Sequence, residues 1–397
     1  MTEHPVLVER MRRFGNTIFG EMSALAAATG SINLGQGFPD TDGPAEILEA
    51  AVAAMRAGHN QYPPATGIEP LRRAIADHQQ RFYGLSYDAD TEVLVTAGAT
   101  EAIASTVLAL CETGDEVIAF EPMYDSYSAC IAMAGAVVRP VTLRPPVDAD
   151  GHGERARFSF DVDELRAAIT PRTKLMLLNS PHNPTGKVFT LAELQSIAAL
   201  AIEHDLIVMT DEVYEHLTFD VQHVPLATLP GMRERTIVVS SSGKTFSFTG
   251  WKIGWICAPA RLVQAVRTVK QFLTYVNGAP FQHAVATALA MDDTYFKGFA
   301  QDLQNKRDLL LGGLRDAGFT AYVPDGTYFI TTDITAFGES DGMAFCRSLP
   351  QRAGVVAIPN VVFYENPAGG QSLVRFAFCK RDEVLIEASA RLRKLRA

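Results

Sequence analysis

The sequence predicts an α/β protein with a mostly parallel central sheet flanked by helices, together with a smaller α+β domain. Strand-like and helix-like segments alternate along most of the chain, which is the pattern of an α/β sheet. The strand-like segments are nearly continuous apolar runs, as expected for strands that are covered on both faces. The chain has 397 residues, which is enough for about two to three domains.

The expected large domain covers residues 46–290. Six apolar runs are predicted to form its strands: 92–96, 116–120, 174–179, 206–210, 236–240 and 253–258. Between the third and fourth runs we expect a helix at 191–204. Thr190 is a good N-cap for this helix, and Glu193 three positions later completes a capping box.

The expected small domain combines residues 1–45 with residues 291–397. Beyond residue 290 the pattern changes to a long charged amphipathic segment at 292–317, which predicts a helix. Two shorter strands are expected near 328–332 and 373–378. A final helix at 382–395 would close the chain.

Composition excludes several classes of protein. Lys and Arg number 35 against 45 Asp and Glu, so the net charge is −10, which argues against a nucleic-acid partner. No apolar run approaches the roughly 18–20 residues of a membrane helix, and the first 20 residues lack the apolar core of a signal peptide. The five cysteines are scattered without C-x-x-C spacing, which suggests neither a metal site nor a disulfide framework. We therefore expect a cytoplasmic protein without a membrane partner.

One motif imitates a nucleotide hydrolase. Residues 236–245, TIVVSSSGKT, resemble a strand followed by a phosphate-binding loop. That loop requires glycine at position 238, where this chain has valine. The strand ending in Asp-Glu, which should follow the loop, precedes it at 206–212. The order and the missing glycine argue against this function.

Residues able to carry chemistry follow several of the expected strands. Lys244 comes after the fifth, Asp211 and Tyr214 after the fourth, and the Asn-Pro-Thr-Gly of residues 183–186 after the third. Taken singly, each has an ordinary structural explanation. Lys244 could be a solvated loop residue, Asp211 a helix N-cap, Tyr214 a packed core tyrosine and Asn183 part of a turn. Their combination narrows the interpretation.

The order and spacing of several motifs resemble those of class I and II aminotransferases, which are fold type I enzymes that use pyridoxal 5′-phosphate. These motifs are NLGQGFP at 33–39, NQY at 60–62, SPHNPTG at 180–186 and residues 249–255. Together with Arg375 they extend the resemblance over nearly the whole chain. It is strongest toward the kynurenine, glutamine and methionine aminotransferases and the N-succinyldiaminopimelate aminotransferases.

The resemblance implies that the α-amino group of an L-amino acid moves to a 2-oxo acid by a ping-pong mechanism. Lyases and biosynthetic synthases or cyclases use the same fold and cofactor, and they stay open as the alternative. A gene regulator with an aminotransferase-like domain would need an added DNA-binding domain. The resemblance begins within the first 35 or so residues, and the chain is acidic, so we set this class aside.

The resemblance also assigns the cofactor contacts. Lys244 would bind the cofactor through its amine and act as the base, Asp211 would keep the ring nitrogen protonated, and Tyr214 with Asn183 would contact the phenolic oxygen. Tyr124 would stack on the ring. The expected phosphate contacts are the helix N-terminus at Gly98, Ala99 and Thr100, the side chains of Ser241 and Lys252, and Tyr62 from the partner subunit of a homodimer. Many relatives have arginine where this chain has Lys252.

Substrate contacts follow from the same resemblance. Arg375 would bind the α-carboxylate, helped by Asn183 and by the backbone at Gly37. Phe19, with Phe14 and Ile18, could line the pocket for the side chain. Tyr124 could join them, as could Val276 and Asn277 from a loop that the family donates across the dimer. An apolar lining would suit methionine, aromatic or kynurenine-like substrates, while N-succinyldiaminopimelate stays open.

Overall fold

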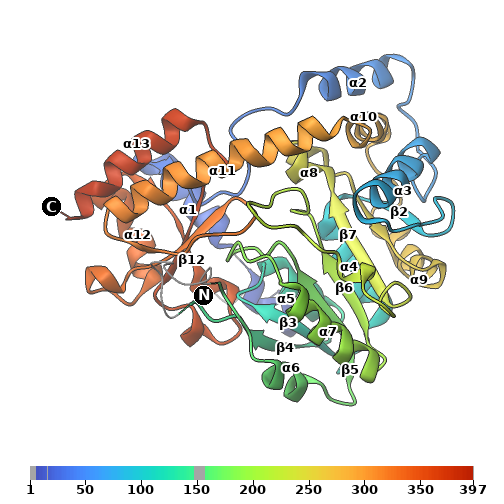
Figure 1. The fold of residues 1–397 in the computed structure, drawn as a ribbon, viewed down its shortest axis with the longest axis horizontal. Helices are drawn as coiled ribbons and strands as arrows, with labels where there is room; N and C mark the ends of the chain where they lie inside the picture. The colour runs from blue at the N-terminus through green and yellow to red at the C-terminus, as the bar shows by residue number, and fades with distance from the viewer. Residues whose placement is uncertain (1–5, 16, 147–156, 397) are drawn as a thin grey trace.

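The structure is a computed structural model that describes residues 6–15, 17–146 and 157–396. The described residues form three sheets, of seven, four and two strands. Figure 1 shows the long helix α11 (Asp293–Asp316) running from the helices beside the larger sheet to those of the C-terminal part. The expected α/β architecture with a smaller α+β part is confirmed.

The seven-stranded sheet contains all six strands expected from the apolar runs. Its order is β2 (Val93–Thr96), β8 (Gly254–Cys257), β7 (Thr236–Ser241), β6 (Ile207–Asp211), β5 (Thr173–Asn179), β3 (Glu116–Glu121) and β4 (Val137–Thr142). Strand β8 is antiparallel to both neighbours, and the other pairs are parallel. Strand β4 was not expected from the sequence. It lies at the sheet edge, where Val137 is exposed and Pro140 interrupts the apolar pattern.

Helices cover both faces of this sheet. They are α2 (Ala45–Arg56), α3 (Glu69–Tyr83), α4 (Gly98–Leu110), α5 (Asp125–Met133), α6 (Val162–Ala168), α7 (Leu191–Glu203), α9 (Ala260–Lys270) and α10 (Ala279–Leu289). Successive strand residues enter different cores. Met209 packs in the core that includes residues of α4, α5 and α9, whereas Val208 packs in the core that includes residues of α7. This double burial explains the continuous apolar runs. Helix α7 begins with the expected capping box of Thr190 and Glu193.

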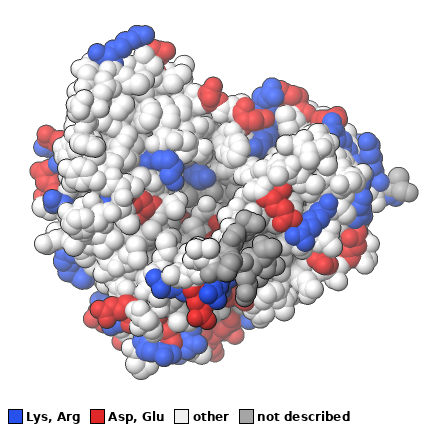
Figure 2. All heavy atoms as spheres, turned by 180° about the vertical axis from the view of Figure 1, so that it is seen from behind, with Lys and Arg blue, Asp and Glu red and all other residues white. Residues whose placement is uncertain are grey.

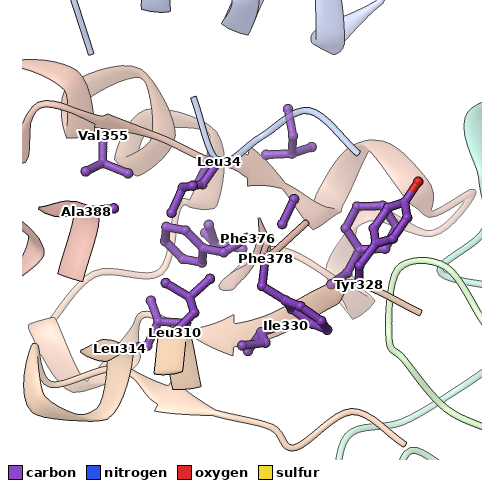
Figure 3. Packing of buried hydrophobic residues seen from close by; sticks show 14 of the residues in the cluster. Leu34, Leu310, Leu314, Tyr328, Ile330, Val355, Phe376, Phe378 and Ala388 are labelled. Atoms are coloured by element: carbon purple, nitrogen blue, oxygen red, sulfur yellow. The ribbon is translucent and has the colours of Figure 1, made fainter. Parts of the chain in front are cut away.

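The C-terminal part has a four-stranded antiparallel sheet in the order β12 (Ile358–Pro359), β13 (Leu373–Ala377), β10 (Phe329–Asp333), β9 (Thr320–Ala321). Helices α11, α12 (Gly342–Ala353) and α13 (Asp382–Leu392) accompany it. The N-terminal segment joins this part, because β1 (Ile32–Asn33) pairs with β11 (Val355–Val356) and α1 (Ile18–Thr29) contacts α12. Figure 3 shows Leu34 in the same core as Leu310 and Phe376. The division at residues 46 and 290 stays a prediction.

The surface carries both charges in mixture. On the face shown in Figure 2, Lys and Arg side chains are interspersed with Asp and Glu rather than gathered into one field. Among the described helices, none combines the length and the apolar character needed to cross a membrane.

Candidate active site

A cavity of about 280 Å³ lies at the carboxyl ends of the parallel strands, where ligands commonly bind in α/β sheets. Strands β5, β6 and β7 end here in Asn179, Asp211 and Ser241, and all three residues line it. Thirteen of the site residues expected from the sequence line this cavity: Phe19, Gly37, Gly98, Ala99, Thr100, Tyr124, Asn183, Asp211, Tyr214, Ser241, Lys244, Lys252 and Arg375.

One corner of the cavity is suited to a phosphate. The first N–H groups of a helix have no partner within it, and here they belong to Gly98, Ala99 and Thr100 at the start of α4. Gly98 has a φ of +75°, and a Cβ at this position would come within 3.1 Å of Lys252 Nζ. A helix N-terminus and a cation therefore face the same space, which Ser241 also lines.

A buried carboxylate lines the cavity. Asp211 is only 5% exposed, and its Oδ2 accepts a hydrogen bond of 2.5 Å from the hydroxyl of Tyr127. Its Oδ1 accepts a bond of 3.3 Å from the backbone N–H of Val213. Burial raises the pKa of Asp211 to about 6, against the opposing effect of these bonds. The group is thus mostly ionised at neutral pH and can pair with a protonated ring nitrogen.

An amine with a lowered pKa lines the same cavity. Lys244 lies in the single turn α8 (Ser242–Thr245), and burial lowers its pKa to about 8. Its Nζ is 5.8 Å from the centre of the Tyr214 ring and 5.6 Å from that of Tyr328. Burial raises the pKa of the Tyr214 hydroxyl, so this group stays a hydrogen-bond donor. Lys244 therefore has the partly neutral amine that nucleophilic and base chemistry require.

A buried guanidinium forms the far side of the cavity. Arg375 on β13 is 1% exposed, and it donates hydrogen bonds of 2.9 Å each to Asn183 Oδ1 and to the carbonyl of Gly35. Its charge lies 4.0 Å from the centre of the Phe329 ring and 5.4 Å from that of Phe19. Its Nε has no partner within the described part of the chain. A buried cation with neutral partners can bind a carboxylate without first breaking an ion pair.

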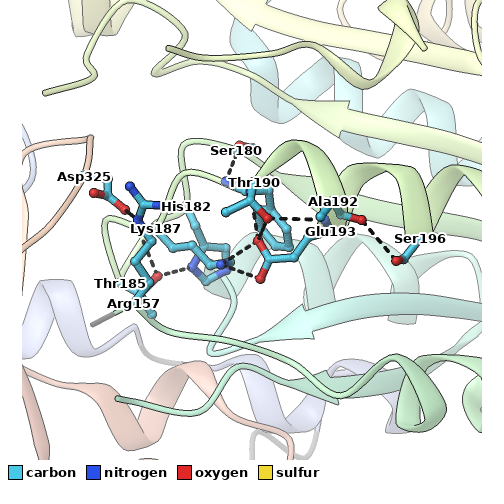
Figure 4. A network of polar contacts seen from close by, with 11 residues as sticks. Arg157, Ser180, His182, Thr185, Lys187, Thr190, Ala192, Glu193, Ser196 and Asp325 are labelled. Atoms are coloured by element: carbon cyan, nitrogen blue, oxygen red, sulfur yellow. Dashed lines mark hydrogen bonds and ion pairs between the residues drawn. The ribbon is translucent and has the colours of Figure 1, made fainter. Parts of the chain in front are cut away.

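Two polar groups position the loop that carries Asn183. The side chain of Asn179 accepts a bond of 2.7 Å from the N–H of Asn183 and donates one of 2.8 Å to the carbonyl of Asp211. Figure 4 shows the polar contacts that connect the same loop to the start of α7. There Lys187 Nζ contacts both carboxylate oxygens of Glu193 at 2.8 and 2.9 Å.

Some expected residues lie elsewhere. Tyr62 is 81% exposed and packs edge-on against Tyr275, outside the cavity of its own chain. Phe14 and Ile18 do not line the cavity, although Phe19 does. Asn277 donates hydrogen bonds to the carbonyls of Thr96 and Lys252 of its own chain.

Sequence reasoning missed other residues at the site, namely Tyr127, Asn179, Tyr328 and Phe329. Tyr127 is three positions after Tyr124, one helical turn, and this spacing was the available signal. Tyr328 donates a hydrogen bond of 2.5 Å to the carbonyl of Gly37. No local pattern distinguishes Tyr328 and Phe329 from ordinary core aromatics.

Comparisons with known proteins identify the family of this chain. The sequence model of the family "Aminotransferase class I and II" matches residues 29–392. The solved N-succinyldiaminopimelate aminotransferase of Mycobacterium tuberculosis superposes with a TM-score of 0.94 at 51% identity, over 98% of this chain and 100% of that one. The methionine aminotransferase of Escherichia coli is 40% identical over the full length of both chains. An aspartate aminotransferase double mutant of Thermus thermophilus has a TM-score of 0.88 at 31% identity, covering 98% of this chain and 99% of that one.

The phosphate corner, the carboxylate, the amine and the guanidinium are the groups that pyridoxal phosphate and an amino acid require, and they line a single cavity. The chain belongs to the class I and II aminotransferases, and it is a pyridoxal-phosphate-dependent enzyme that transfers amino groups between amino acids and oxo acids.

Proposed function

We propose that Lys244 is the residue that binds the cofactor covalently and moves the substrate proton. The observation that carries this proposal is its position, since Lys244, Asp211 and Arg375 line one cavity. Bound pyridoxal phosphate supplies an electron sink that allows the bond between the substrate α-carbon and its hydrogen to break. Asp211 would keep the ring nitrogen protonated. Arg375 would fix the α-carboxylate, and Lys244 Nζ would take the proton and return it.

The first test is a Lys244→Ala variant. We expect turnover to fall by at least about a thousandfold, because both the covalent link and the base are lost. Lys306→Ala is the control and should keep full activity, because Lys306 is a half-buried residue of α11 that lies outside the cavity. The visible absorbance of the cofactor and the far-UV circular dichroism of both variants complete the measurement. Turnover at the control's rate by a folded Lys244→Ala protein would exclude the assignment.

We propose that the donor is an α-amino acid with an uncharged, largely apolar side chain. Among the described residues lining the cavity, the cationic side chains are Lys244, Lys252 and Arg375. Two are assigned to the cofactor and the third to the α-carboxylate, so this lining offers no cation for a second acidic group. The aromatic side chains of Phe19, Phe38 and Tyr124 suit a methionine-like or aromatic substrate instead.

N-succinyldiaminopimelate is the second candidate. The observation in its favour is the 51% identity to a protein of that name over 98% of this chain. A panel of methionine, phenylalanine, kynurenine, glutamate and N-succinyldiaminopimelate as donors, compared by kcat/KM, decides between the two. A preference of more than tenfold for N-succinyldiaminopimelate over all apolar donors would overturn the first proposal.

The carboxylate role has its own test in Arg375→Lys. Lysine keeps the charge but loses the planar fork, so we expect kcat/KM for amino acids to fall about a hundredfold, mainly through KM. Arg307→Lys is the matched control, because Arg307 is also a buried arginine beside an aromatic ring but lies outside the cavity. Equal effects of the two substitutions would place the carboxylate site elsewhere.

We further propose a homodimer in which Tyr62 reaches the site of the partner. Tyr62 and Phe272 are 81% and 83% exposed, and Leu273 and Tyr275 lie beside them in sequence or space. This aromatic surface borders the phosphate corner, since Thr274 donates a hydrogen bond to Glu101 on α4. A second copy covering it would bury these side chains.

Light scattering of the purified protein tests the dimer directly. We expect twice the chain mass for the wild type and a shift toward the monomer for Phe272→Asp. Tyr62→Phe should stay dimeric but bind pyridoxal phosphate several-fold more weakly. A wild-type monomer with full activity would overturn this proposal. The cytoplasm stays our proposed compartment, because all five cysteines are buried and unpaired.

A further inference from the structure

Tyr127 contacts Asp211, the carboxylate that lines the cavity, directly. It lies in the first turn of α5, and its ring is 2% exposed within the core beneath α4 and α5. Its hydroxyl donates a hydrogen bond of 2.5 Å to Asp211 Oδ2, a residue 84 positions away in sequence. The backbone N–H of Val213 donates to the other carboxylate oxygen at the longer distance of 3.3 Å.

The hydrogen bond from Tyr127 and the burial of Asp211 have opposite effects on the ionisation of this carboxyl group. A hydrogen bond donated to a carboxylate stabilises its ionised form, whereas burial favours the neutral acid. Burial also raises the pKa of Tyr127 well above its ordinary value, so the phenol stays protonated and remains the donor. The bond therefore opposes the burial that raises the pKa of Asp211 to about 6.

We propose that Tyr127 is a positioning residue that keeps Asp211 ionised and aimed at the cofactor ring nitrogen. This inference rests on the proposed role of Asp211 toward pyridoxal phosphate. Packing in the core requires the ring of Tyr127 but not its hydroxyl. The ring alone fills the core and meets Tyr124 edge-on at 5.9 Å, and phenylalanine would do both equally well.

The test is Tyr127→Phe, which keeps the ring and removes the hydroxyl. We expect the acid limb of the kcat/KM profile to move up by about one pH unit, because loss of a tenfold preference for the ionised form equals one unit. The pH titration of the visible absorbance of bound pyridoxal phosphate should move in the same direction. We also expect kcat to fall about tenfold and the dissociation constant of the cofactor to rise several-fold.

Tyr87→Phe is the matched control. Tyr87 is a buried tyrosine whose hydroxyl has no partner within the described residues, and it lies in a different core. This variant should leave the pH profile, the absorbance titration and the cofactor affinity unchanged. If Tyr127→Phe behaved like Tyr87→Phe, Tyr127 would be a packing residue only, and the inference would be wrong.

A double-mutant cycle separates this inference from the proposed function. In an Asp211→Asn background, Tyr127→Phe should have little further effect on kcat or on cofactor affinity, because its partner charge is already gone. Fully additive losses would show that Tyr127 acts on something other than Asp211. Failure of the wild-type protein to bind pyridoxal phosphate would instead reject the proposed function itself.

Discussion

Asp211 and Glu215 are two buried acids on one segment that face different surroundings. Each is 5% exposed, and burial raises the pKa of Asp211 to about 6 and that of Glu215 to about 7. Asp211 lines the cavity together with Lys244, whereas Glu215 does not line it. Glu215 instead accepts a hydrogen bond of 2.6 Å from Ser240. A raised pKa therefore does not by itself mark a functional acid; the cavity and the facing amine do.

The surroundings of Glu215 form a polar network with a structural role. His216, the next residue, lies with its Nε2 2.7 Å from Nε2 of His78 on α3. Burial lowers the pKa of both imidazoles, that of His78 to about 3, so they share a hydrogen bond as neutral rings. Glu212 contacts His223 at 2.7 Å. This network fixes the segment whose other side presents Asp211 to the cavity.

The sharpest test of this comparison is to neutralise each acid without changing its size. Asp211→Asn should lower kcat/KM by at least about a hundredfold, because a neutral amide cannot hold the ring nitrogen in its protonated form. Glu215→Gln should keep kcat/KM within about threefold, since Glu215 does not line the cavity. Steady-state kinetics at one fixed pH provides the measurement. If Glu215→Gln were the more damaging change, the two assignments would have to be exchanged.

Some residues of the site could be predicted from the sequence, whereas others could not. Lys244, Asp211 and Arg375 were predicted because each follows or lies on a strand within a recognisable motif, and all three line one cavity. Tyr127 was not predicted, because its role depends on a contact across 84 positions that only the folded strand order creates. In the sequence Asn179 is simply the last residue of an apolar run. Its two hydrogen bonds, to Asn183 and to the carbonyl of Asp211, depend on the folded path of the following loop, which no local pattern encodes.

The elements of the fold were likewise predictable only where the local sequence carries their pattern. Double burial by helices leaves a local trace, which is the continuous apolar run, and all six such runs form strands. The sequence of edge strand β4 has a less regular apolar pattern. The two-residue strands β9 and β12 are too short to show any pattern. The position of Tyr62 on the surface could be interpreted only through the expected second subunit.

The two acids should also differ in how they affect the dependence of stability on pH. Between pH 4.5, the ordinary pKa of Glu215, and about 7, the folded protein retains a proton that the unfolded chain has released. The free energy of unfolding therefore falls as pH rises through this window and levels off above it. Asp211 has the same sign in a window from 3.8 to about 6.

Glu215→Gln should remove the upper of these two windows. From pH 4.5 to 7.5 we expect the wild type to lose about 3 kcal/mol more stability than the variant, since each unit of pKa difference corresponds to about 1.4 kcal/mol. Urea unfolding at a series of pH values measures this difference. Parallel pH profiles for the two proteins would show that Glu215 titrates near its ordinary value.

The smallest effects on affinity and stability are expected for Ser240 and Ser241, two adjacent residues of β7. One of them faces each of the two environments compared above. Successive side chains of a strand point to opposite faces, and here Ser241 lines the cavity while Ser240 donates its hydroxyl to Glu215. Ser241→Ala should weaken pyridoxal phosphate binding up to about tenfold with unchanged thermal stability of the cofactor-free protein. Ser240→Ala should cost about 1–2 kcal/mol of stability while cofactor affinity stays the same, because it leaves a buried acceptor without its donor. Fluorescence titration with the cofactor and thermal melts of both variants separate the two outcomes. If both substitutions weakened cofactor affinity alike, a change at Glu215 would be transmitted to the cavity through the segment after β6. The Asp211 side and the Glu215 side of that segment could then not be treated as independent.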